Sequence, residues 1–201
     1  MKRWLATALL LSGCAGSPSP PIQHYGLAPA LPAPTTRPAC AEPLALAKLR
    51  GARPYATTRM LYQASDLRQS AFAWSRWRDT PLALLELHLV EGLSRSGPFA
   101  AVLPPGSRGR SRLILEGTLL DFSLHTESRP PQGRLESRWL LIDKTKGQVL
   151  AGRHFLHQVP VTTASPQSTA DALNRATGEL IEALGRWLTH QMEGRCTPAP
   201  S

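Results

Sequence analysis

Two leucine-rich helical patterns, with alternating apolar and polar stretches between them, limit the folds open to this chain of 201 residues. The first pattern, 81–96, begins where Thr80 can serve as N-cap and Pro81 loses no backbone hydrogen bond. The second opens at 165–168 and ends before Gly194. Because period-two alternation is typical of half-buried strands, the sequence predicts an α+β fold. We expect a two-layer sandwich, a mostly antiparallel sheet with two amphipathic helices on one face.

Local signals refine this prediction. The apolar phase changes within the strand at 112–124 near Gly117, which predicts a bulge. In the first helix, leucines at helical spacing predict a core stripe that Leu87 widens. In the second helix, Ser168 and Asp171 are spaced as a capping box. Strands are expected at 44–49, 57–63, 70–77, 99–103, 112–124, 135–141 and 149–155, with a hairpin loop at 143–147.

The N-terminus has the features of an export signal. Lys2 and Arg3 precede an apolar run, 4–11, that is too short to span a bilayer core of ~30 Å. The run ends in Leu11-Ser12-Gly13-Cys14, which resembles the bacterial lipobox. We expect a lipoprotein signal peptide at 1–13 and lipid attached to Cys14, and the alternative is an ordinary signal peptide that contains a cysteine. Because Ala15 is not the aspartate that retains lipoproteins in the inner membrane of enteric bacteria, we expect the outer membrane, facing the periplasm.

Composition then divides the mature chain. Residues 14–39 are rich in proline and are expected to form a lipidated tether, able to reach roughly 75 Å at ~3.1 Å per residue. Within it, 24–27 is an apolar island that could pair as a short edge strand. A single α+β lipoprotein domain is expected at 40–192, followed by a C-terminal tail at 193–201.

The three cysteines suggest one disulfide. If Cys14 carries lipid, Cys40 and Cys196 remain as a pair in a compartment that permits disulfides. Both lie at the edges of the expected domain, where chain ends are often close together. The bond would hold the tether and the tail at one end of the domain. Two free thiols are the alternative.

The net charge of the protein limits the classes of partner that it is expected to bind. The net charge of +9 falls to +7 once Lys2 and Arg3 leave with the signal. A basic protein favours anionic partners, but nucleic acid is not expected for an exported lipoprotein. Anionic lipid headgroups, that is phospholipid, are the candidate that remains.

The sequence offers no catalytic motif, cofactor site or metal site that we would defend. A loop at 106–109 lacks the strand–turn–helix context of a nucleophile elbow. His154 and His157 lie three positions apart on an expected strand, so they face opposite sides and cannot share one ion. Glu116 and Asp121 are also oddly spaced and would share a face only if a bulge intervenes.

The order of these parts resembles the ABC-type transport auxiliary lipoproteins. After the lipobox and the proline-rich segment come Tyr25-Gly26-Leu27, then Tyr62 and Ser65. Trp77-Arg78-Asp79-Thr80-Pro81 opens the leucine-rich helix and Ser96-Gly97-Pro98-Phe99 follows it. The family tends to carry a bulky residue where this chain has Gly26, and the Cys40/Cys196 pair is not a feature we associate with it.

The resemblance implies a non-catalytic role without cofactors. It implies an outer-membrane-anchored periplasmic component that binds an MCE (mammalian cell entry)-domain protein and an ABC permease in lipid trafficking between membranes, as in paraquat-inducible systems. Phospholipid and a second copy of the chain are further candidate partners. One alternative is a lipoprotein chaperone or plug that assists an outer-membrane assembly such as lipopolysaccharide insertion. Another is an envelope hydrolase.

Overall fold

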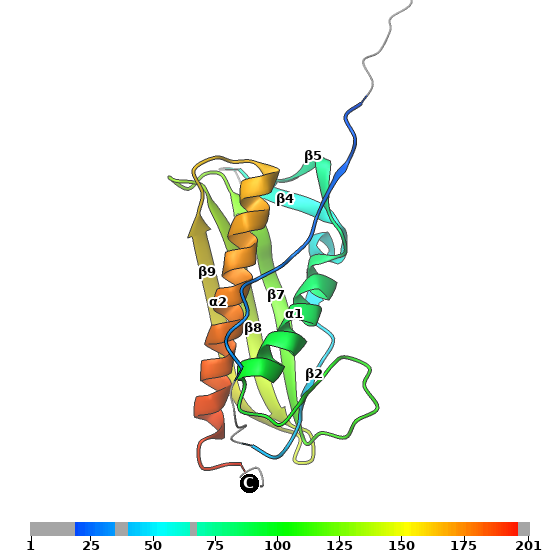
Figure 1. Ribbon diagram of the computed structural model, residues 1–201, viewed down its shortest axis with the longest axis vertical. Coiled ribbons are helices and arrows are strands. Elements are labelled where there is room, and N and C mark those ends of the chain that lie inside the picture. The colour runs from blue at the N-terminus through cyan, green and yellow to red at the C-terminus, as the bar shows by residue number, and fades with distance from the viewer. Residues whose placement is uncertain (1–18, 35–39, 65–67, 197–201) are drawn as a thin grey trace, which may run out of the picture.

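The computed structural model describes residues 19–34, 40–64 and 68–196. Within them a nine-stranded mixed sheet carries two α-helices on one face (Figure 1), and this confirms the expected α+β sandwich. The elements are β1 (Gln23–Tyr25), β2 (Leu44–Leu46), β3 (Arg50–Gly51), η1 (Arg53–Ala56), β4 (Arg59–Gln63), β5 (Gln69–Trp77), α1 (Pro81–Ser96), β6 (Val102–Leu103), β7 (Leu113–His125), β8 (Gln132–Asp143), β9 (Gln148–Pro160) and α2 (Pro166–Met192).

Helix α1 has the bounds that the sequence predicts. Thr80 caps it, because its hydroxyl accepts a hydrogen bond from the backbone N–H of Ala83. Leu85, Leu89 and Leu93 are fully buried. The predicted widening of the stripe to Leu87 is wrong, since that side chain is 64% exposed.

Helix α2 begins three residues before the predicted capping box. Ser165 is the N-cap, and its hydroxyl accepts from the N–H of Ser168, while the Ser168 hydroxyl accepts from the N–H of Ser165. Pro166 fixes this start, because it takes the first helical position at no cost in hydrogen bonds. Asp171 instead accepts a hydrogen bond from Gln167 one turn earlier.

The sheet combines two kinds of pairing. Its long strands β7, β8 and β9 are antiparallel neighbours, as predicted. The other edge of β7 pairs in parallel with β2, β3 and β4 in succession, so the short strands together satisfy the backbone groups of one long strand. The sequence did not predict this parallel half of the sheet.

Strand β7 contains the expected bulge at a different position. Its register against β8 shifts between Leu119 and Asp121, so the phase change occurs at Leu120 rather than at Gly117. Gly117 has another role, since a Cβ there would lie 2.5 Å from both Leu49 and Trp139. The glycine lets these two side chains pack directly on the backbone.

Candidate functional site

A disulfide joins Cys40 to Cys196 across 156 positions, with Cα atoms 5.1 Å apart. Cys40 is fully buried, and its N–H donates to the carbonyl oxygen of Pro98. The bond therefore ties the residues after α2 to the start of the core and to the end of α1. Cys14, the expected lipid attachment residue, lies outside the described residues.

Residues 23–34, which the sequence assigns to the tether, are built into the fold. Strand β1 pairs in parallel with β5, which confirms an edge strand in this region. Beyond Gly26, the carbonyl oxygen of Leu27 lies 3.0 Å from Nε2 of His88 on α1. The N–H of Ala28 donates to Oδ1 of Asn174 on α2 at 2.5 Å. Figure 1 shows this N-terminal segment, in blue, crossing the helix layer on the side away from the sheet.

The two ends of the described chain therefore lie far apart. Residues 19–22 leave the domain beside β5, whereas the disulfide and the end of α2 lie at the opposite end (Figure 1). The expectation that the bond holds tether and tail at one end is wrong. The reason is that the N-terminal segment runs back along the helices instead of leaving directly from Cys40.

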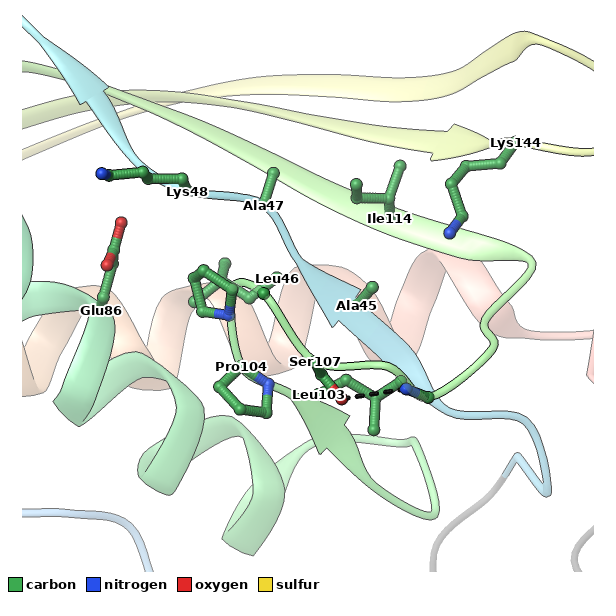
Figure 2. Close-up of a pocket in the computed structure, with 13 residues that line it drawn as sticks. Ala45, Leu46, Ala47, Lys48, Glu86, Leu103, Pro104, Ser107, Ile114 and Lys144 are labelled. Atoms are coloured by element: carbon green, nitrogen blue, oxygen red, sulfur yellow. Dashed lines mark hydrogen bonds between the residues drawn. The ribbon is translucent and has the colours of Figure 1, made fainter.

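A hollow of about 530 Å³ lies between β2, α1 and the loop that follows β6 (Figure 2). Ala45, Ala47 and Ile114 contribute apolar surface to it. Figure 2 shows Lys48 near Glu86 on one side of the hollow and Lys144 on the other. Its lining contains no histidine, cysteine or aspartate. The hollow can therefore take an apolar group flanked by negative charge, but it holds no nucleophile with a base.

Three contacts hold the walls of the hollow in place. Oε1 of Glu86 accepts a 2.6 Å hydrogen bond from the N–H of Leu49, which fixes the chain after β2 against α1. Arg112 lies 3.1 Å from Glu42 and 3.4 Å from Asp143, and so joins the start of β7 to the hairpin that carries Lys144.

Asp143 organises that hairpin. Its Oδ1 accepts from both the hydroxyl and the N–H of Thr145. The hydroxyl bond above all, with help from backbone N–H groups and the charge of Arg112, holds the pKa of Asp143 below its usual range. The predicted hairpin loop at 143–147 is thus held by a carboxylate that stays ionised.

A second polar cluster surrounds Asp121 at the bulge of β7. The hydroxyls of Tyr55 and Ser123 both donate to Oδ1 of Asp121, at 3.1 and 2.6 Å. Nε2 of His125 lies 2.6 Å from Oδ2, and its Nδ1 lies 2.7 Å from Glu127. Asp121, Ser123 and His125 are all buried.

This cluster changes the ionisation of its members. Hydrogen bonding to Asp121 is the main cause that raises the pKa of His125 above 6.5, although burial opposes it. Burial, then the charge of Asp121, raises the pKa of Tyr55 to about 12. Ser123 and His125 both bond to the one carboxylate, so the serine is not placed as a nucleophile on the histidine. Sequence reasoning missed His125, although 121, 123 and 125 alternate on one strand face.

The acidic and histidine residues that the sequence analysis considered as pairs have separate partners. The bulge does bring Glu116 and Asp121 to one face, but Glu116 pairs with Arg50 at 3.0 Å. His154 bonds to Glu136 in the sheet, whereas His157 bonds to Glu179 of α2, which confirms that the two histidines face opposite sides. Among the described residues, no group of three or more histidine, cysteine or acidic side chains is arranged to hold a metal ion. The helices of this part of the chain are also too short or too polar to cross a membrane.

A comparison with models of protein families shows to which family the chain belongs. The model of the ABC-type transport auxiliary lipoprotein component matches residues 25–185. The chain belongs to this family. The match starts at the last residue of β1 and ends seven residues before the end of α2, so it includes β2 to β9, α1 and most of α2. It confirms the resemblance seen in the sequence.

Solved structures share the fold of this auxiliary lipoprotein. The crystal structure of protein XCC0632 from Xanthomonas campestris has a TM-score of 0.75 at 21% identity, covering 86% of this chain and 99% of that chain. The crystal structure of an uncharacterized protein has a TM-score of 0.66 at 16% identity, covering 84% and 99%. A comparison with curated proteins found no match.

Proposed function

We propose that this auxiliary lipoprotein is anchored in the outer membrane and serves an MCE-type ABC transport system in the periplasm. In this proposal it is a binding and structural component of that system, which moves lipids between the two membranes. The observation that carries the proposal is the family match over 25–185, which spans nearly the whole folded part.

The anchor in this proposal is lipid on Cys14. Since β1 already belongs to the fold, we place the tether at 14–22 and the start of the domain at Gln23. Gln23 lies nine positions after Cys14, and a fully extended chain of that length reaches about 30 Å. The domain therefore stays much closer to the membrane than the composition of 14–39 suggests.

The role is non-catalytic in this proposal. The best-connected polar cluster, around Asp121, is buried and offers Ser123 no base. The hollow at the other end of the domain has lysines and one glutamate but no histidine or cysteine. Both arrangements fit structural and binding roles better than hydrolysis.

The hollow is the surface that we assign to the partner. Two of its lining elements, β2 and the loop after β6, lie towards the disulfide end and away from where residues 19–22 leave (Figure 1). In this proposal that end is the one farther from the anchoring membrane. A partner that crosses the periplasm from the inner membrane would meet this end first. The MCE-domain protein, together with its ABC permease, is the partner in this assignment.

Photo-crosslinking in the native host tests the proposal. A photoreactive amino acid at Ala47, in the hollow, should crosslink to an MCE-domain protein, and one at the exposed Leu87 serves as the control. Co-purification of an MCE protein or ABC permease without an Ala47 adduct would contradict only the assigned surface. Absence of both proteins from the purified material would contradict the function, and an outer-membrane assembly barrel in their place would favour the role in lipopolysaccharide insertion.

A further inference from the structure

Two large apolar side chains are exposed side by side at the β1–β5 edge. Trp74 is 44% exposed and Ile22 is 48% exposed. The parallel register sets Gln23 opposite Ser75, so Ile22, one position earlier, lies opposite Trp74. Trp77 of the same strand shows the contrast, since it is buried and packs against Phe122 in a tilted arrangement with ring centroids 5.5 Å apart.

A row of basic side chains lies beside this pair. Arg76 is the register partner of His24 on β1 and of Arg59 on β4, so three basic residues stand next to one another across three strands. Like charges placed directly opposite destabilise a sheet unless an anion is near them. Nη1 of Arg76 donates to backbone carbonyl oxygens of β5, those of Phe72 and Ser75 at 2.8 Å, which leaves its other guanidinium N–H groups for an anion. Strands β1, β4 and β5 contain no aspartate or glutamate to supply that anion.

The position of this surface identifies what covers it. Ile22 lies only eight residues after Cys14, so it can be no more than about 30 Å from the lipidated residue even if the chain between them is fully extended. If Cys14 carries the anchor, this surface is therefore close to the membrane, since residues 19–22 leave the domain beside β5 (Figure 1). Tryptophan and isoleucine beside basic residues are the composition that settles at the boundary between acyl chains and anionic headgroups.

We propose that the surface formed by Ile22, Trp74, His24, Arg76 and Arg59 docks on the lipid bilayer that carries the Cys14 anchor. This inference rests on the lipidation in the proposed function. Trp74 and Ile22 enter the outer part of the acyl layer, and the basic row contacts the headgroup phosphates. Docking orients the domain, so that the disulfide end and its hollow project away from the membrane.

Quenching of tryptophan fluorescence by brominated lipid tests the docking. The mature, lipidated protein is placed in vesicles of phosphatidylcholine and phosphatidylglycerol with brominated acyl chains. Trp77, Trp139 and Trp187 are at most 4% exposed, so Trp74 is the described tryptophan that can meet the bromines. We expect quenching in the wild type and its loss in Trp74→Phe, with an unchanged circular dichroism spectrum.

A matched reporter at the other end controls for free tumbling. Val149 is 54% exposed and lies at the start of β9, next to the hairpin at the disulfide end. In the Trp74→Phe background, Val149→Trp should show no quenching. Vesicle-bound wild type without quenching, or equal quenching at 74 and 149, would overturn the docking but leave the anchor intact. Protein that does not float with the vesicles would overturn both the docking and the lipid anchor.

Discussion

Ala28 and Asn174 are 146 positions apart, yet the N–H of Ala28 donates a 2.5 Å hydrogen bond to the side-chain oxygen of Asn174. Together with the contact between Leu27 and His88, this bond fastens the N-terminal segment across both helices. It turns a stretch with the composition of a linker into part of the domain. The direction in which residues 19–22 leave the domain depends on it.

Replacing Asn174 tests this attachment. Asn174→Ala removes the acceptor of the Ala28 N–H, and we expect a loss of about 1 kcal/mol in the free energy of unfolding. Hydrogen exchange at the Ala28 amide should accelerate. Asn174→Asp keeps the acceptor oxygen and serves as the control. Equal exchange rates at Ala28 in the wild type and in Asn174→Ala would contradict the account.

Two leucine substitutions in α1 distinguish its buried face from its exposed face. Leu85 is 1% exposed, so Leu85→Ala should cost about 2–5 kcal/mol in chemical denaturation. Leu87→Ala, at a 64% exposed position, should stay within about 0.5 kcal/mol. Similar losses from the two leucine substitutions would mean that the helix presents another face to the sheet.

Glu86 gives a separate test within the same helix. Periodicity places it on the polar side, but its carboxylate accepts the N–H of the buried Leu49. Glu86→Ala should therefore cost about 1–2 kcal/mol through the unpaired N–H. Glu86→Gln, which keeps an acceptor oxygen, should recover most of this loss, and no difference between the two variants would count against the hydrogen bond.

The disulfide should contribute strongly to stability. Chain-entropy arguments give about 5 kcal/mol for a loop of this length, as an upper bound. Mass spectrometry of a non-reduced tryptic digest should show one crosslinked pair that contains Cys40 and Cys196. Reduction should lower the denaturation midpoint, with the Cys40→Ala/Cys196→Ala variant as the control that no longer responds. Two alkylated free thiols in periplasmically expressed protein would contradict the bond.

The cluster around Asp121 predicts how stability depends on pH. The folded-state pKa of His125 is raised above 6.5, mainly by its hydrogen bond to Asp121. Protonated His125 therefore stabilises the fold fully below pH 6.5, and this contribution is lost as the pH rises through the folded-state pKa. His125→Gln should flatten that part of the profile in urea denaturation, whereas the exposed His190→Gln should leave it unchanged. Identical profiles for the wild type and His125→Gln would show that the cluster does not hold a proton.

Local signals made part of this structure predictable. The bounds of α1 follow from Thr80-Pro81 and from leucine spacing, which act within one helix. The partner of Cys40 follows from counting cysteines once Cys14 is set aside. The hairpin at 143–147 follows from turn residues between two alternating strands. Each of these features depends either on residues that are neighbours in the sequence or on a residue type that occurs only three times.

The missed features depend on partners that a pattern does not specify. Local residue preferences predict strands at 44–49 and 57–63, but they do not say that both lie parallel to β7. The shared face of Asp121 and Glu116 depends on a bulge at Leu120, which a phase change locates only approximately. The attachment of Ala28 to Asn174 joins two distant segments through one polar contact, and no periodicity reports such a contact.

Membrane fractionation of the wild type and of Cys14→Ser tests the central claim, which is that Cys14 holds this auxiliary lipoprotein at the outer membrane. Wild-type protein should sediment with outer-membrane fractions on a sucrose gradient, and its N-terminal peptide should carry the mass of attached acyl chains. Cys14→Ser should lose the acyl mass and leave those fractions. A Cys14→Ser protein that still distributes with the outer membrane like the wild type would contradict the account.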